Sequence, residues 1–196
     1  MSALRKLHIA HLGQPASLAI RAERASDVAA REALLDCAFG DNRQLRTCQR
    51  LREGRAPAEG LALSAVRHAG LVGTLRLWHV SAGGVPVLLL GPLAVDPACR
   101  GFGVGAVLTH QALALASARG HGAVILLGDP SYYGRFGFSA SKTAELSLPG
   151  PFERERLLGL ELRDGALDSA CGMIVPTGAA LVRHAAKPRR PAAQAA

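Results

Sequence analysis

A strand–loop–helix–strand pattern between residues 85 and 127 constrains the fold of this chain more than any other feature. Residues 85–95 form an apolar run long enough for a buried strand, and an Asp-Pro turn separates it from the sequence RGFGVG at 100–105. Apolar residues then recur at positions 104, 107, 108, 112 and 115, the spacing of one helix face, and the pattern ends at Gly120. A second apolar run covers residues 123–127. The pattern predicts two buried strands joined through a glycine-rich loop and a helix.

Three glycines, Gly101, Gly103 and Gly105, stand where this loop enters the helix. Backbone N–H groups at the start of a helix are unpaired and lie at the positive end of the helix dipole. Glycine lacks the Cβ atom that would hold a phosphate away from those groups. The loop therefore predicts a site for a pyrophosphate.

One interpretation of the loop is a dinucleotide site. Gly101-x-Gly103-x-x-Ala106 satisfies that fingerprint, and Asp129 stands roughly where a ribose-binding acid is expected, about 20 residues further on. A nucleotide-dependent oxidoreductase is therefore an alternative. One observation against this alternative is that five residues, 96–100, separate the strand from the first glycine. In a dinucleotide site a tight turn connects the strand directly to that glycine. The sequence after the motif also lacks the run of βα units that a doubly wound sheet needs, and residues 131–138 would have no use there.

Two motifs together resemble the GNAT superfamily of N-acetyltransferases. Its pyrophosphate loop, Gln/Arg-x-x-Gly-x-Gly/Ala, is matched by Arg100-x-x-Gly103-x-Gly105, and its fourth helix, aromatic-Tyr-x-x-x-Gly-Phe, by YYGRFGF at 132–138. With the neighbouring VDP and LGDP, the combination most resembles the bacterial YhbS-like branch. The resemblance implies an α/β (α+β) acyl-CoA N-acyltransferase fold. In that fold a mixed, mostly antiparallel central sheet has flanking helices, and the strands before and after the 104–120 helix splay apart.

The remaining pattern fits such a sheet. Residues 61–68 and 71–80 are strand-like runs joined through Ala69-Gly70, and they lead into the central strand as an antiparallel meander. Residues 18–21 are predicted as a first strand. Ser26-Asp27 is expected to begin a helix that ends at Gly40. Its inward residues are expected to be Val28, Leu35 and Phe39, and later strands are expected at 146–148, 157–162 and 172–176.

A second helix is predicted over residues 43–53, and it carries Arg43, Arg46, Arg50 and Arg52. The resemblance implies that the first two helices flank the acceptor site. A basic helix there could attract an acidic acceptor, and a solvated helix face accounts for the arginines equally well.

Gly91-Pro92 interrupts the central strand, where proline cannot donate a ladder hydrogen bond. The resemblance implies that the pantetheine arm of acetyl-CoA lies between the splayed strands and pairs with the backbone of Leu93, Ala94 and Val95. An ordinary β-bulge is the alternative.

The resemblance implies acetyl transfer from acetyl-CoA, as co-substrate, to a primary amine of an unidentified small molecule or peptide. Tyr133 matches the family tyrosine that protonates the leaving thiolate. The alternative is that Tyr133 packs against the coenzyme and has no role in proton transfer. Its neighbour Tyr132 is expected to take part in aromatic packing. Residues 85–95 contain no carboxylate, so the candidate bases are His79, Asp129 (which could instead cap a helix) and ordered water. Many members of the resembled family place a glutamate on or near the central strand, and its absence here leaves a non-catalytic acyl-CoA-binding regulator as a further alternative. The residues expected to contact the coenzyme are Leu93, Ala94, Val95, Arg100, Gly101, Phe102, Gly103, Val104, Gly105, Tyr133 and Arg135.

Composition bounds the remaining possibilities. The 196 residues are 49% hydrophobic with no run long enough to span a bilayer, and five of the eight net positive charges lie in residues 1–17 and 184–196. We therefore expect a flexible leader (1–17), one acetyltransferase domain (18–183) and a disordered basic tail (184–196), with neither nucleic acid nor membrane as a partner. Four cysteines without metal or redox spacing predict reduced thiols in a cytoplasmic protein with no metal site. We also expect a monomer or homodimer.

Overall fold

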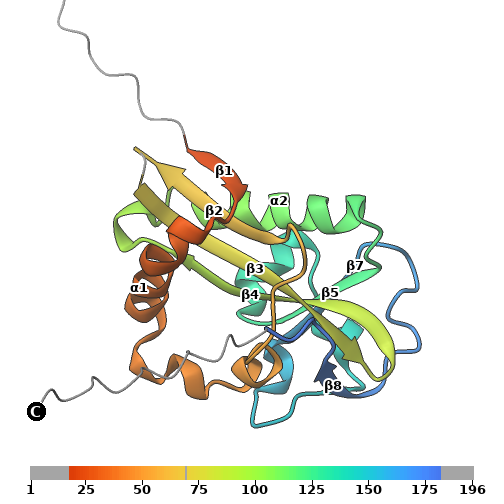
Figure 1. The fold of residues 1–196 in the computed structure, drawn as a ribbon. Helices are drawn as coiled ribbons and strands as arrows, with labels where there is room; N and C mark the ends of the chain where they lie inside the picture. The colour runs from red at the N-terminus through yellow and green to blue at the C-terminus, as the bar shows by residue number, and fades with distance from the viewer. Residues whose placement is uncertain (1–17, 69, 182–196) are drawn as a thin grey trace, which may run out of the picture.

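The computed structural model describes residues 18–68 and 70–181 (Figure 1). The predicted leader (1–17), the predicted tail (184–196) and the hairpin residue Ala69 lie outside the described residues. No described helix is both long and apolar enough to cross a membrane. All four cysteines belong to the described part of the chain and are free.

One mixed sheet forms the centre of the molecule. Its main path follows the order β1 (Ala19–Ala22), β2 (Ala62–Arg67), β3 (Gly70–Ala82), β4 (Val85–Val95), β5 (Ala123–Leu127) and β7 (Leu157–Glu161). Every neighbouring pair on this path is antiparallel except β4 and β5, which are parallel. The predicted meander, the single parallel crossover and the late strands are thereby confirmed. Two further strands, β6 (Leu146–Ser147) and β8 (Gly172–Pro176), pair with each other, and β8 also pairs with the end of β3.

The two parallel strands separate soon after they meet. They pair only at Leu88 with Val124 and at Leu89 with Ile125, so residues 91–95 of β4 have no partner on β5. On its other side, β4 shifts register, since Leu77 faces Leu90 whereas Leu75 faces Leu93. Two residues, Gly91 and Pro92, thus stand opposite one residue of β3. The central strand therefore contains the β-bulge given as one interpretation of Gly91-Pro92, and it also splays away from β5.

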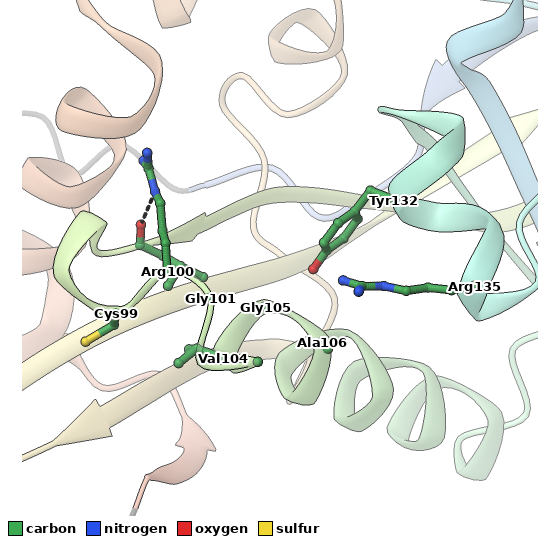
Figure 2. Close-up of a pocket in the computed structure, with 10 residues that line it drawn as sticks. Cys99, Arg100, Gly101, Val104, Gly105, Ala106, Tyr132 and Arg135 are labelled. Atoms are coloured by element: carbon green, nitrogen blue, oxygen red, sulfur yellow. Dashed lines mark hydrogen bonds between the residues drawn. The ribbon is translucent and has the colours of Figure 1, made fainter.

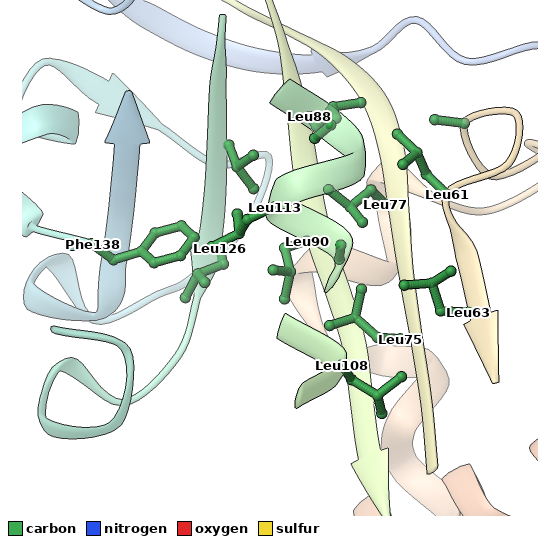
Figure 3. Packing of buried hydrophobic residues seen from close by; sticks show 14 of the residues in the cluster. Leu61, Leu63, Leu75, Leu77, Leu88, Leu90, Leu108, Leu113, Leu126 and Phe138 are labelled. Carbon is green, nitrogen blue, oxygen red and sulfur yellow. The ribbon is translucent and has the colours of Figure 1, made fainter. Parts of the chain in front are cut away.

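The long helix α2 (Val104–Ala118) covers one face of the sheet, because Leu108, Ala112 and Leu113 are buried against leucines of β3 and β4. Figure 3 shows this layer, in which Leu75, Leu77, Leu88 and Leu90 point toward the helix. α2 ends at Ala118 and is followed by Arg119 and Gly120, where the helix was predicted to end. Gly120 has a φ of +80°. A second buried cluster includes Val87 and Leu89, the alternate residues of β4.

The first helix, α1 (Val28–Phe39), buries Arg31, Leu34 and Leu35. The predicted inward position of Val28 is wrong, since this side chain is 43% exposed. Arg31, which is buried and ion-paired with Glu23 and Glu32, occupies the inward side of the first turns instead. Leu35 packs with Ala94 of β4, so α1 lies directly over the splayed part of the central strand.

The predicted helix over residues 43–53 is also wrong. The segment forms two 3₁₀ helices, Asp41–Leu45 and Thr47–Leu51, with Arg46 in an extended conformation between them. Thr47 Oγ1 donates to the carbonyl of Pro151 at 2.5 Å and Arg50 donates to that of Pro149, so long-range hydrogen bonds fix the local path. Its arginines are not all on a solvated face, because Arg43 and Arg52 are half-buried while Arg46 and Arg50 are exposed.

Candidate active site

The glycine-rich loop is built to present backbone N–H groups. After β4 ends, the carboxylate of Asp96 accepts a hydrogen bond from Ala98 N at 2.8 Å and caps a single 3₁₀ turn, Pro97–Cys99. Gly101 and Gly103 then have φ of +82° and +77°, which favour glycine. Gly103 is the N-cap of α2, and no side chain of the described residues caps it. The first N–H groups of α2 are therefore available to a ligand.

A cavity of about 370 Å³ lies over this helix start (Figure 2). Arg100 and Arg135 flank it, and neither forms a salt bridge with the described carboxylates. Arg100 Nε makes a long hydrogen bond of 3.4 Å to Val95 O, and the guanidinium of Arg135 lies 4.1 Å from the centre of the Tyr132 ring. Two unpaired cations beside a helix N-terminus favour a phosphorylated ligand.

Seven of the residues expected to contact a coenzyme line the cavity: Val95, Arg100, Gly101, Gly103, Val104, Gly105 and Arg135. Three further residues that were not predicted also line the cavity, namely Cys99, Ala106 and Tyr132. The sequence contained a signal that could have identified two of these three residues. Ala106 is the third small residue of the Gly-x-Gly-x-x-Ala spacing, and Tyr132 stands three residues before Arg135, on the same side of a helical turn.

The other expected contacts lie outside this cavity. Leu93 packs beside Gly105, since a Cβ built on Gly105 would be 3.9 Å from a methyl of Leu93. Ala94 faces the opposite side of the sheet, where it is buried against Leu34 and Leu35. Phe102 is 72% exposed and lines a separate hollow.

The two adjacent tyrosines of α3 (Pro130–Tyr133) point to different places. The hydroxyl of Tyr132 lies over the start of α2, 2.7 Å from a Cβ built on Gly105 (Figure 2). Its ring packs against those of Tyr133 and Phe136, as expected, with centres 4.8 and 5.6 Å apart, and Tyr132 also lines the cavity. Tyr133 is half-buried, and its ring is pressed onto Gly128, where a Cβ would come within 2.4 Å. Its ring centre is 5.8 Å from that of Phe138, and burial raises the pKa of its hydroxyl well above the usual value.

The two candidate bases lie at opposite ends of β5. Asp129 follows the end of β5 and caps α3, because its carboxylate accepts from Ser131 N at 2.9 Å and from Ser131 Oγ at 2.8 Å. These hydrogen bonds lower its pKa. His79 is exposed on β3 and lies 5.4 Å, between ring centres, from His121, which precedes the start of β5. The structure therefore separates His79 from the tyrosines.

A mostly antiparallel sheet, a splayed parallel pair and a glycine-rich helix start together define the class of acyl-CoA N-acyltransferase folds. The chain belongs to the acetyltransferase (GNAT) family, whose family model matches residues 28–138. The glycine loop is therefore an acetyltransferase motif and not a dinucleotide site, because the chain belongs to this family and its sheet is not doubly wound.

Two relatives extend the likeness along the chain. This chain is 29% identical over 157 residues to YhbS of Escherichia coli strain K12, an uncharacterized N-acetyltransferase. The aligned residues cover 79% of this chain and 93% of that protein. A crystal structure of E. coli YhbS in complex with CoA is similar with a TM-score of 0.72 and 28% identity, over 86% of this chain and 94% of that one. A GNAT family acetyltransferase from Brucella melitensis in complex with acetyl-CoA gives a TM-score of 0.58 and 28% identity, over 74% and 88% of the two chains. Among the described residues, no cluster of histidine, cysteine or carboxylate side chains is suited to a metal ion.

Proposed function

We propose that the protein transfers an acetyl group from acetyl-CoA to a primary amine of a small molecule or peptide. The observation that carries the proposal is the uncapped start of α2, flanked by Arg100 and Arg135, directly beside the splayed end of β4. Membership of the acetyltransferase family supports the reaction, and the CoA and acetyl-CoA bound by the two similar structures support the coenzyme.

In the proposed complex, the pyrophosphate of acetyl-CoA accepts hydrogen bonds from the N–H groups that follow Gly103. The pantetheine arm lies in the gap between β4 and β5, where residues 93–95 have no partner on β5. Backbone groups in such a gap need a partner, and the amides of pantetheine can supply one. The thioester is then held near the end of β5, close to α3.

The chemistry begins with a neutral amine, which requires that an ammonium first lose a proton. The amine nitrogen forms a bond with the thioester carbonyl carbon, the carbon–sulfur bond breaks, and the sulfur leaves as a thiolate. The thiolate takes up a proton, and the new amide nitrogen gives one up. We assign the first of these protons to Tyr133, because its raised pKa keeps the hydroxyl protonated at neutral pH.

Tyr132 and the base complete the proposed mechanism. Since the hydroxyl of Tyr132 lies over Gly105, we assign it to the pyrophosphate. Asp129 is a weak base, because its carboxylate is held by Ser131 and its pKa is lowered. We therefore propose that the ammonium loses its proton through ordered water. The free cysteines are compatible with the expected cytoplasmic location.

Ligand-induced stabilisation is the first test. At 100 times its Kd, acetyl-CoA is expected to raise the melting temperature by about 5–10 °C, whereas NAD(P) is expected to leave it unchanged. A panel of amines with thiol detection is the second test. A shift with acetyl-CoA but no thiol release with any amine would favour the regulator that binds acyl-CoA without transferring it; a shift with NAD(P) alone would contradict the proposal.

A further inference from the structure

A small cavity of about 120 Å³ lies beside the bulge of β4, apart from the cavity at the start of α2. Arg52, which follows the second 3₁₀ helix, lines this cavity together with Trp78 and Pro92. The other charged residues that line it are Glu32, Arg43 and Arg76. A Cβ built on Gly91 would lie 3.7 Å from Nη1 of Arg52. The guanidinium of Arg52 is therefore next to the point where β4 and β5 begin to separate.

Arg52 is a half-buried cation without a counter-ion among the described residues. Its Nε is buried and has no hydrogen-bond partner among residues 18–68 and 70–181. No salt bridge joins Arg52 to a carboxylate in that part of the chain. A buried charge without a partner destabilises a fold, so a group placed this way is expected to have another use.

The nearby carboxylates are already engaged by other arginines. Glu23 is ion-paired with Arg31 and Arg76. Glu32 is ion-paired with Arg31 and Arg43, and Asp36 with Arg43. Three carboxylates thus neutralise three arginines, whereas Arg52 and the exposed Arg46 have no ion pair among the described residues.

No other described group is suited to supply the missing negative charge. Cys48 is the one neighbour whose ionisation would favour the charged form of Arg52, and burial raises the pKa of that thiol, so it is neutral at pH 7. Arg43, Arg46 and Arg76 repel Arg52 and, together with burial, lower its pKa. An anionic ligand would satisfy the guanidinium.

We propose that Arg52 binds the carboxylate of the acceptor, and that the acceptor is a small amino acid in which amine and carboxylate lie close together. This inference rests on the proposed acetyl transfer. Arginine binds a carboxylate through two parallel hydrogen bonds, and a cavity of about 120 Å³ has room for a carboxylate with a few carbon atoms. Its position at the bulge would direct the amine toward the gap that the thioester occupies.

Stability of the ligand-free protein is the first test. Arg52→Met removes an unpaired charge whose Nε is buried and is expected to raise the melting temperature. Arg31→Met is the control, because Arg31 is buried and ion-paired with Glu23 and Glu32, and this variant is expected to lower the melting temperature. A fall with Arg52→Met comparable to that with Arg31→Met would mean that Arg52 is a structural residue, which contradicts the proposal.

Acceptor preference is the second test. We would measure thiol release with α-, β- and γ-amino acids and with the amide of each. At least one acid is expected to exceed its amide by about 10-fold or more in kcat/KM. Arg52→Gln should abolish that preference, Arg52→Lys should restore part of it, and the Kd of acetyl-CoA should not change. Equal use of acids and amides, or an unchanged preference in Arg52→Gln, would overturn the carboxylate site while leaving acetyl transfer intact.

A binding measurement decides the case in which no amine releases thiol. The melting temperature of the CoA-saturated protein would be recorded with N-acetyl amino acids and with their amides. A shift that requires both the carboxylate and Arg52 would support the site even though acetyl transfer had failed. Absence of such a shift would overturn it.

Discussion

The hydroxyl groups of Tyr132 and Tyr133 differ in their surroundings, and the difference sets what each can do. Tyr132 reaches over Gly105 and lies beside Arg135, so its hydroxyl can donate to a bound phosphate. Tyr133 is packed on Gly128 among aromatic rings, where burial favours the neutral phenol. A hydroxyl that stays protonated over the whole neutral range is a suitable donor to a thiolate.

Phenylalanine at either position removes one oxygen and keeps the ring, so the two variants are matched. Tyr133→Phe is expected to lower kcat by about 10²–10⁴-fold and to leave the Kd of acetyl-CoA nearly unchanged. Tyr132→Phe is expected to raise that Kd by about 5-fold, the loss of one hydrogen bond, with kcat nearly unchanged. Steady-state kinetics with calorimetric titration of CoA separate these effects. The reverse result would make Tyr132 the proton donor, and equal kcat values would exclude both assignments.

Helix α2 has a glycine with a positive φ at each end, but only one end adjoins the proposed coenzyme site. Gly103 precedes α2 with a φ of +77°, and Gly120 follows it with a φ of +80°. A Cβ on either glycine would meet no heavy atom within 4 Å. The two positions therefore share the same backbone strain and differ in the charge that the site requires.

Gly103→Asp is expected to weaken CoA binding by at least about 100-fold, because the carboxylate would repel the pyrophosphate. Gly105→Asp should act in the same direction, since its side chain would also collide with the hydroxyl of Tyr132. Gly120→Asp is the control, with similar strain and unchanged affinity for CoA. Isothermal titration measures all three. Unchanged affinity in both loop variants would mean that the site is misplaced, and equal losses in Gly103→Asp and Gly120→Asp would attribute the effect to strain.

The central sheet of the molecule has an apolar layer on each face. Asp27 links the first two strands at one edge of this sheet through hydrogen bonds. Its carboxylate accepts from both terminal nitrogens of Arg21 in β1, at 2.6 and 2.8 Å, and from Ser64 Oγ in β2 at 2.9 Å. It also accepts from Arg24 N at 2.9 Å, at the start of the 3₁₀ turn Ala25–Asp27 that leads into α1. The hydrogen bonds from Arg21, above all, hold the pKa of Asp27 well below its usual range.

Asp27→Asn is expected to reduce the free energy of unfolding at pH 7 by about 1–3 kcal/mol. Because the folded-state pKa is lowered, the stabilisation is complete above the unfolded-state pKa of about 4 and declines as the pH falls below it. The difference between the two proteins should therefore shrink by about 1.4 kcal/mol for each pH unit below about 4. Urea unfolding at pH 7, 4 and 3 measures it. Glu59→Gln, at an exposed carboxylate, is the control, and a difference that does not vary with pH would contradict the role of Asp27.

The sequence by itself determined the features that depend on neighbouring residues. The glycine loop, the end of α2 at Gly120 and the strands around them follow from local backbone freedom and the spacing of apolar side chains. The two motifs at residues 100–105 and 132–138, in this order, were also sufficient to identify the family. Such signals act over one or two helical turns, so they are readable along the chain.

Only the tertiary structure decided the features that depend on distant residues. Hydrogen bonds from Thr47 and Arg50 to Pro151 and Pro149, about 100 residues away, replace the predicted helix with two short turns. The Tyr133 ring packs on Gly128, whereas the hydroxyl of its neighbour Tyr132 lies over Gly105. The engagement of Glu23, Glu32 and Asp36 by other arginines leaves Arg52 unpaired. Burial and pairing are set by what the fold brings together, and sequence spacing does not contain that information.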